Sequence, residues 1–329
     1  MLTYPFDPPE GPHPVQVAPG ISWLRLPLPW ALNHVNAYLL EDDTGLTLVD
    51  TGIDSPDLRA FWTEALGSRP VTRVIVTHHH PDHMGLAGWF QARGAELMTS
   101  RTAWLYARML TLDPDPFPPE AAIFLTRAGL TAPQIDDRRA RAFRASDTMA
   151  PLPPGFTRLS EGDTLQAAGR HWRVRLGQGH APDHLTLWSD DVVLMGDQVL
   201  PRISPNIGVY PTEPEADPLG EYLTSLATMA PLDRGQMILP GHQRPFRGLG
   251  PRIAELQAEH AQGLDRLQAL LATPRRAVEC FPALFRREIG PGEFGLALAE
   301  TLAHLNHLQA LGRAARHPGP QGAFLWQAL

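Results

Sequence analysis

The stretch T77-H78-H79-H80-P81-D82-H83-M84-G85 places four histidines and one aspartate within six consecutive positions. It follows V71-T-R-V-I-V-T, an apolar run typical of a buried strand, and precedes residues 84–94, which we expect to form a helix ending at Gly94. The histidines therefore lie on the loop at the carboxyl end of a strand, where α/β folds place their ligands.

Within this loop the side chains should divide into two sets. His78 and His80 are two residues apart on extended backbone and should point the same way, with His79 pointing elsewhere. Asp82 and His83 fall at the turn into the helix and can face a second point nearby. Imidazole and carboxylate are suitable ligands for zinc or iron. The alternative is a polar turn in which Asp82 caps the helix and the histidines are exposed.

Three further metal-capable residues each follow a strand-like run at a turn marked by glycine. They are His180 in G177-Q-G-H-A-P-D-H, Asp197 in L194-M-G-D-Q and His242 in L239-P-G-H-Q. A glycine before each candidate ligand lets the backbone turn tightly and approach an ion. This repeated pattern favours a metal site over the polar turn.

Two blocks of short strand patterns with flanking helices, residues 20–100 and 157–245, predict an α/β fold in which two sheets pack face to face with helices outside. Between them, residues 101–154 predict a helical insert, and residues before about Pro19 an irregular arm. We expect a catalytic domain over 1–246 and a mainly helical module over 247–329. The last helix and the hairpin of this module are typical of a winged-helix domain.

Composition limits the classes of partner. With 43% apolar and 19% charged residues the chain is typical of globular proteins, and its net charge of -7 makes it a poor general binder of nucleic acid. The lone Cys280 excludes an intramolecular disulfide and a cysteine-rich zinc site. Residues 1–10 lack the features of a signal peptide, and no apolar run approaches about 18 residues. We expect a cytoplasmic protein that does not bind membranes, with a homodimer as the candidate assembly.

The set H78-x-H80-x-D82-H83 with His180, Asp197 and His242 resembles the metallo-β-lactamase superfamily. Supporting strings are V49-D-T-G, G179-H-A-P-D-H in place of the common G-H-[ST]-P-G-H, and G196-D. The resemblance covers about residues 20–245 and implies a four-layer αβ/βα sandwich of two mixed β-sheets with a binuclear site at one edge.

Carried over residue by residue, the resemblance assigns two divalent ions, with Zn²⁺ expected and Fe or Mn as alternatives. His78, His80 and His180 hold the first metal, Asp82, His83 and His242 hold the second, and Asp197 bridges both. Asp82 and Asp197 are also the candidate catalytic carboxylates. Asp50 is expected to form a hydrogen bond to a ligand histidine without binding the metal itself, and His184 is expected to have a similar supporting role. Tyr38 and Tyr210 are open candidates for hydrogen-bond donors to a substrate oxyanion.

The resemblance implies that a metal-bridging hydroxide attacks the substrate. The segment from Gly196 and the helical tail are similar to the glyoxalase-II-like and lactamase-β-2-like branch. Because the insert is apolar and the net charge acidic, we expect a small acyl substrate with an ester, thioester or lactone bond. Dedicated β-lactamase activity is disfavoured, because such secreted enzymes carry signal peptides and lack the long helical tail.

Three alternatives remain. A phosphodiesterase or endoribonuclease would grip RNA with arginine pairs such as 275–276 and 286–287. A persulfide dioxygenase would use one iron held by two histidines and an aspartate. A non-catalytic binding protein is disfavoured because all seven ligand positions are filled.

Overall fold

The computed structural model describes residues 1–285 and 287–329, and it divides into two compact units. The first unit comprises residues 1–113, 144–205 and 230–252, and the second comprises residues 114–143, 206–229 and 253–329. Both units are therefore discontinuous in sequence. The boundary expected at residues 246/247 remains a prediction.

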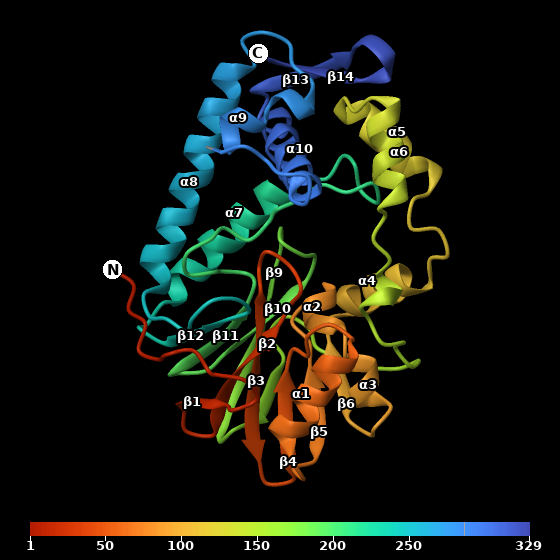
Figure 1. Ribbon diagram of the computed structural model, residues 1–329. Helices are drawn as coiled ribbons and strands as arrows, with labels where there is room; N and C mark the ends of the chain where they lie inside the picture. The colour runs from red at the N-terminus through yellow and green to blue at the C-terminus, as the bar shows by residue number, and fades with distance from the viewer. Residues whose placement is uncertain (286) are drawn as a thin grey trace. The chain divides into compact units, whose positions relative to one another are not determined.

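The first unit contains two mixed sheets (Figure 1). The seven-stranded sheet runs in the order β1 to β7, antiparallel from β1 to β4 and parallel from β4 to β7. Its strands are β1 (Val15–Ala18), β2 (Ile21–Pro27), β3 (His34–Asp42), β4 (Gly45–Val49), β5 (Val71–Ile75), β6 (Glu96–Thr99) and β7 (Thr157–Arg158). Residues 15–18 pair with β2, so the expectation of an irregular arm before Pro19 was wrong for this segment.

The five-stranded sheet has the order β12-β11-β10-β9-β8, and only β11 and β12 are parallel. Its strands are β8 (Thr164–Ala167), β9 (Arg170–Gly177), β10 (His184–Trp188), β11 (Val192–Gly196) and β12 (Met237–Pro240). One buried core joins the two sheets, since it combines Trp23, Leu40 and Ile75 of the larger sheet with Trp172, Leu187 and Leu239 of the smaller one. The predicted pair of mixed sheets packed face to face is thus confirmed.

A second core covers the other face of the larger sheet. There, Leu24, Leu48 and Val74 pack against side chains of α1 (Pro56–Leu66), α3 (Ala87–Gln91) and α4 (Arg101–Leu112). Helix α1 begins as the sequence predicts: the Ser55 side chain accepts a hydrogen bond from the Leu58 N–H at 3.1 Å, with Pro56 in the first turn. Gly67, with φ of 56°, ends it.

The helix expected over residues 84–94 is instead two short helices, α2 (Pro81–Met84) and α3. The Leu86 N–H donates to the Gly52 carbonyl and to Thr51 Oγ1, each at 3.1 Å. A Cβ on Gly85 would lie 2.5 Å from the Gly52 carbonyl oxygen. The close approach of residues 51–52 therefore takes the backbone donor that a continuous helix would use.

The second unit is mainly helical. It contains α5 (Pro119–Ala128), α6 (Ala132–Ala140), α7 (Pro218–Met229), most of α8 (Leu249–Leu270), α9 (Phe281–Leu284) and α10 (Phe294–Ala310), together with the hairpin of β13 (Ala314–Pro318) and β14 (Phe324–Ala328). Short 3-10 turns lie at Ala277–Glu279 and Pro320–Gly322 in this unit, and at Ala145–Asp147 and Ala230–Leu232 in the first unit. Helix α10 is the centre of this unit, because Leu298, Leu305 and Leu308 are buried on it. The predicted helical C-terminal region is confirmed.

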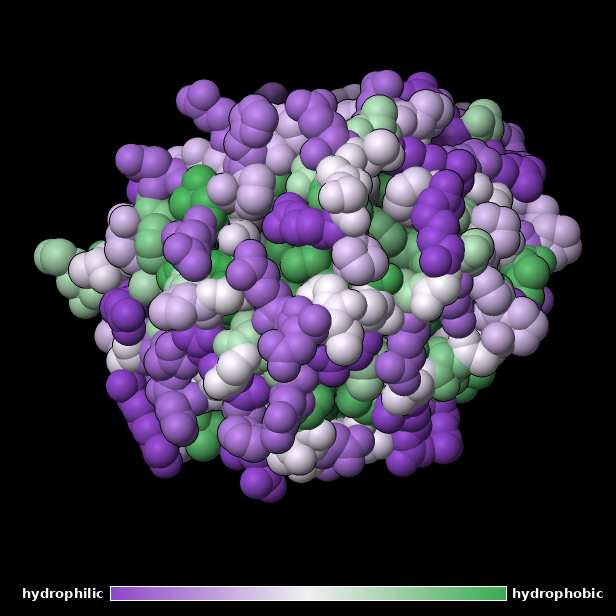
Figure 2. Space-filling model, turned by 90° about the horizontal axis from the view of Figure 1, so that it is seen from below, coloured by the Kyte–Doolittle hydropathy of each residue, from purple (hydrophilic) through white to green (hydrophobic). Residues whose placement is uncertain are grey.

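One face of the molecule is mixed in polarity. On the face shown in Figure 2, hydrophobic residues form small separate groups among hydrophilic ones. Among the described residues, every helix is too short or too polar to cross a membrane.

Candidate metal centre

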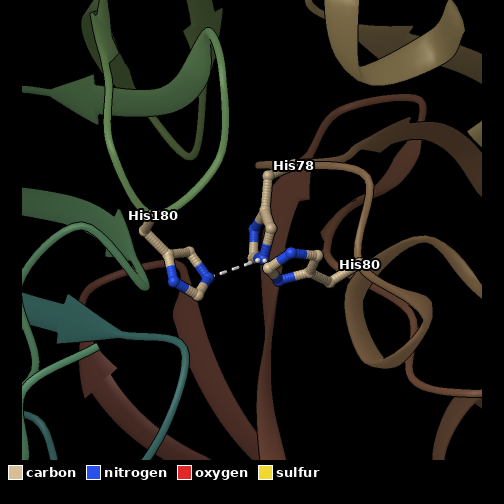
Figure 3. Close-up of side chains that lie close together, drawn as sticks. All are labelled: His78, His80 and His180. Atoms are coloured by element: carbon tan, nitrogen blue, oxygen red, sulfur yellow. Dashed lines mark hydrogen bonds between the residues drawn. The ribbon is translucent and has the colours of Figure 1, made fainter. Parts of the chain in front are cut away.

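Three histidines from two distant loops converge in the first unit (Figure 3). His78 and His80 follow β5, and His180 lies on the loop between β9 and β10. His78 Nε2 lies 2.9 Å from His80 Nδ1 and 3.2 Å from His180 Nε2. Together they form one group of three candidate ligand atoms.

His79, between them, faces another way. Its ring packs against Tyr106 of α4, with 4.9 Å between the ring centroids. The alternation of an extended backbone therefore separates His79 from its two neighbours, as the spacing suggested.

A second group combines Asp82 and His83 of α2 with His242, which follows β12. Asp82 Oδ2 lies 3.3 Å from His242 Nε2 and 3.6 Å from His83 Nε2. Asp82 and His83 lie in the short helix that begins at Pro81, and His242 follows Gly241 just after β12.

Asp197, immediately after β11, joins the two groups. Its Oδ2 atom lies 3.6 Å from His180 Nε2, 3.4 Å from His83 Nε2 and 3.2 Å from His242 Nε2. One carboxylate oxygen thus approaches nitrogens of both groups, and the structure brings all seven predicted ligand residues together.

Hydrogen bonds behind the rings determine which nitrogen of each histidine carries the proton. His83 Nδ1 lies 2.8 Å from Asp50 Oδ2, and His242 Nδ1 lies 2.7 Å from the His34 carbonyl oxygen. Because carboxylates and carbonyls only accept, both Nδ1 atoms must donate. Both Nε2 atoms therefore face the centre and are the nitrogens that could bind a metal ion.

The same centre leaves buried polar atoms without a hydrogen-bond partner. Among the described residues these include His83 Nε2 and Asp197 Oδ1. Lone pairs of imidazole and carboxylate that face one another at 3.2–3.6 Å repel unless a positive charge lies between them. The donor set therefore fits metal cations, and nitrogen and oxygen donors without sulfur are suited to zinc, iron or manganese.

The pKa values of His242 and Asp197 also indicate that the centre favours a positive charge. Burial opposes protonation of His242, but Asp197 and Asp82 outweigh it and raise its pKa to about 10. Burial also opposes ionisation of Asp197, yet His242 and His83 hold its pKa well below the usual value. Burial and the neighbouring imidazoles hold the pKa of His78 well below its usual value. The His78 ring is therefore uncharged and can offer a nitrogen lone pair to a metal ion.

Asp50 lies behind the ligand residues and organises two of them. Its carboxylate accepts from Thr77 N and Thr77 Oγ1 as well as from His83 Nδ1. Thr77 Oγ1 in turn lies 3.0 Å from His78 Nδ1. Asp50 thus orients His83 directly and His78 through Thr77, which is the supporting position that the sequence suggested.

His184 uses its Nε2 atom for a hydrogen bond to the backbone and does not point that nitrogen at the candidate ligand atoms. Its Nε2 accepts a hydrogen bond from the Asp197 backbone N–H at 3.1 Å, and its ring stacks on His78 with 4.6 Å between centroids. His184 therefore supports both Asp197 and His78 from outside the centre.

Glycines allow the close approach of two loops. A Cβ on Gly241 would lie 2.1 Å from Asp197 Oδ1, and one on Gly196 would lie 2.6 Å from His184 Cε1. Larger residues at these positions would displace a candidate ligand or its support.

Three residues of β3 hold the His242 loop, and two of them, His34 and Asn36, were not among the site residues expected from the sequence. The His34 carbonyl accepts from His242, and His34 Nε2 accepts from the Gln243 N–H at 2.9 Å. Asn36 Nδ2 and the Tyr38 hydroxyl both donate to the Pro240 carbonyl at 2.8 Å. Tyr38 is therefore an anchor for this loop in the core, whereas Tyr210 belongs to the second unit, where its hydroxyl donates to Asn206 Oδ1 at 3.5 Å.

Comparisons with known proteins agree with this site. Residues 30–242 match the family model of the metallo-beta-lactamase superfamily, and residues 264–329 match that of the metallo-beta-lactamase-like C-terminal domain. The chain is 25% identical over 305 residues to the probable metallo-hydrolase YqjP of Bacillus subtilis (strain 168), covering 87% of this chain and 91% of that protein.

Two solved structures are similar over nearly the whole chain. A beta-lactamase domain protein from Burkholderia ambifaria is 38% identical, with a TM-score of 0.92, and the match covers 100% of this chain and 98% of that one. The metallo-beta-lactamase family protein TTHA1429 from Thermus thermophilus is 30% identical, with a TM-score of 0.81 and coverage of 95% and 100%. The chain belongs to the metallo-beta-lactamase superfamily and is a metallo-hydrolase of that superfamily.

Proposed function

We propose that this enzyme hydrolyses an ester, thioester or lactone bond of a small substrate with an apolar acyl chain, using two divalent metal ions, with zinc as the expected metal. The observation that carries the proposal is the position of Asp197 Oδ2 within 3.6 Å of nitrogens from both ligand groups. A carboxylate oxygen between two groups of donors could serve two neighbouring metal ions, which supports a two-metal site.

In this proposal His78, His80 and His180 would hold one ion, Asp82, His83 and His242 would hold the other, and Asp197 would contribute its carboxylate to both. When bound, such a pair supplies Lewis acidity that activates water near neutral pH and polarises the bond to be cleaved. The chain itself fixes the donors: Asp50 orients His83, and the His34 carbonyl orients His242. This preorganisation reduces the reorganisation needed during the reaction.

The apolar substrate class is supported by helix α4. Its residue Tyr106 packs on His79, which is next to a candidate ligand. On the same helix Leu105, Met109 and Leu112 are 51%, 42% and 64% exposed at a spacing that places them on one face. An exposed apolar face on a helix that contacts the metal loop would favour an acyl chain.

Binding of RNA receives less support from the described arginines. Arg276 pairs with Glu279 at 3.0 Å, and Arg287 pairs with Glu293 at 2.5 Å. Arg286, which the RNA hypothesis also used, lies outside the described residues. Arginines engaged by carboxylates would have to break those pairs before they could contact phosphate.

The test is hydrolysis of a panel of thioester, ester, lactone, phosphodiester and β-lactam substrates by the zinc-loaded protein. We expect turnover of at least one acyl substrate, its abolition in His80→Ala, and wild-type turnover in the control His171→Ala, whose histidine is exposed on β9. Preference for the phosphodiester, or no turnover of any substrate, would overturn the proposal.

A further inference from the structure

We infer that Thr102 and Asp183 position His180, so that helix α4 sets the metal affinity of the three-histidine group. The inference rests on the proposed metal site and adds two residues outside the ligand set. Its basis is a hydrogen-bond network that connects α4 to the loop carrying His180.

The loop is closed by reciprocal hydrogen bonds at its two ends. The Asp183 N–H donates to Gln178 Oε1 at 2.9 Å, and Gln178 Nε2 donates to Asp183 Oδ1 at 2.8 Å. His180 lies between these two residues in the chain. Gln178 also accepts, at its backbone oxygen, a 3.1 Å hydrogen bond from the side chain of Gln198, the residue after Asp197.

Asp183 occupies a backbone conformation that usually costs energy for a residue with a side chain. Its φ is 50°, in the left-handed region that favours glycine. An aspartate can occupy this region when local hydrogen bonds of its short side chain compensate for the strain. Its bonds within the loop and to α4 supply that compensation.

The connection to α4 is made by the second carboxylate oxygen. The Thr102 hydroxyl donates to Asp183 Oδ2. Thr102 and Tyr106 are four residues apart on α4 and lie on the same face, and Tyr106 packs on His79. One helical face therefore contacts the loop of His78 and His80 as well as the loop of His180, which fixes the separation of the three histidines.

The experiment compares Thr102→Val, which removes only the hydroxyl, with Asp183→Gly, which removes the side chain but permits the backbone conformation. Thr111→Val is the matched control, because the Thr111 hydroxyl on the same helix donates to the Ala107 and Arg108 carbonyls of α4 itself. Each protein is loaded with Zn²⁺, and release of zinc to a chelator is followed over time, with circular dichroism to verify folding.

Wild type and Thr111→Val should release zinc in two phases at the same rates. In Thr102→Val and Asp183→Gly one phase should be faster by about 10–100-fold, the range for residues that orient metal ligands, and the double variant should be no faster than the single ones. Unchanged release in folded Thr102→Val and Asp183→Gly would overturn the inference while leaving the proposed function intact. A wild type that retains no zinc would overturn both.

Discussion

Asp197 Oδ2 lies 3.2 Å from His242 Nε2, and the two residues follow the neighbouring parallel strands β11 and β12. The same oxygen lies 3.6 Å from His180 Nε2, which belongs to the other group of candidate ligands. Adjacent strand ends thus deliver a carboxylate and an imidazole to one point, and that carboxylate connects the two groups of candidate ligands.

Replacement of Asp197 by Asn should weaken metal binding while the protein still folds. The amide keeps the size of the side chain but lacks the negative charge that offsets the cations. We expect metal affinity and activity to fall by more than the roughly 10–100-fold typical of residues that only orient ligands. Elemental analysis and hydrolysis rates would measure this, and an Asn variant with full metal content would contradict the role of Asp197.

Replacement of Gly241 by Ala tests the close approach of the His242 loop. The added Cβ would lie 2.1 Å from Asp197 Oδ1, so either the loop or the carboxylate must move. We expect at least tenfold weaker metal binding, whereas Gly295→Ala, with nothing within 4 Å of its Cβ, should bind metal as wild type does. Equal zinc affinities in the two variants would show that the contact is unimportant.

Replacement of Tyr38 by Phe distinguishes an anchor from a substrate donor. The hydroxyl donates to the Pro240 carbonyl and is buried, so its loss should reduce the free energy of unfolding by about 1 kcal/mol. Metal content and kcat should stay near the wild-type values. A large fall in kcat at unchanged stability would instead place the phenol in contact with substrate.

Glu300 in the second unit should make stability depend on pH. Burial raises its pKa to about 7, although a hydrogen bond from Asn206 partly opposes the shift. Because the folded state holds the proton more tightly than the unfolded state, stability should fall as pH rises from about 4.5 to about 7. Glu300→Gln should therefore be more stable than wild type at pH 8, by up to about 3 kcal/mol, but not at pH 4.

Urea denaturation of both proteins at pH 4 and pH 8 would measure this difference. A stability gain of the same size at both pH values would show that ionisation of Glu300 is not its cause.

Much of the site could be predicted from the sequence, because its ligands lie in short strings with fixed spacing. His78, His80, Asp82 and His83 fall within six residues, and a glycine directly precedes each of His180, Asp197 and His242. The support of His242 by His34 could not be predicted in this way, since the two residues are 208 positions apart and the contact uses a backbone carbonyl. The spacing of residues within a short stretch of sequence does not indicate a hydrogen bond between two such distant residues.

Fold prediction had a similar limit. The strands and helix α1 follow from apolar runs and capping residues that act locally. The break between α2 and α3 depends on Leu86 bonding to residues 51–52, about 35 positions earlier in the chain. A helical pattern in residues 84–94 gives no sign of that competing partner.

The most direct test of the two-metal account is the metal content of the purified protein, together with that of His80→Ala and His242→Ala. We predict two equivalents of zinc-like metal per wild-type chain and selective loss from one position in each variant, because the two histidines serve different ions. A wild-type chain that binds a single iron, with both histidine variants losing the same ion, would contradict the account.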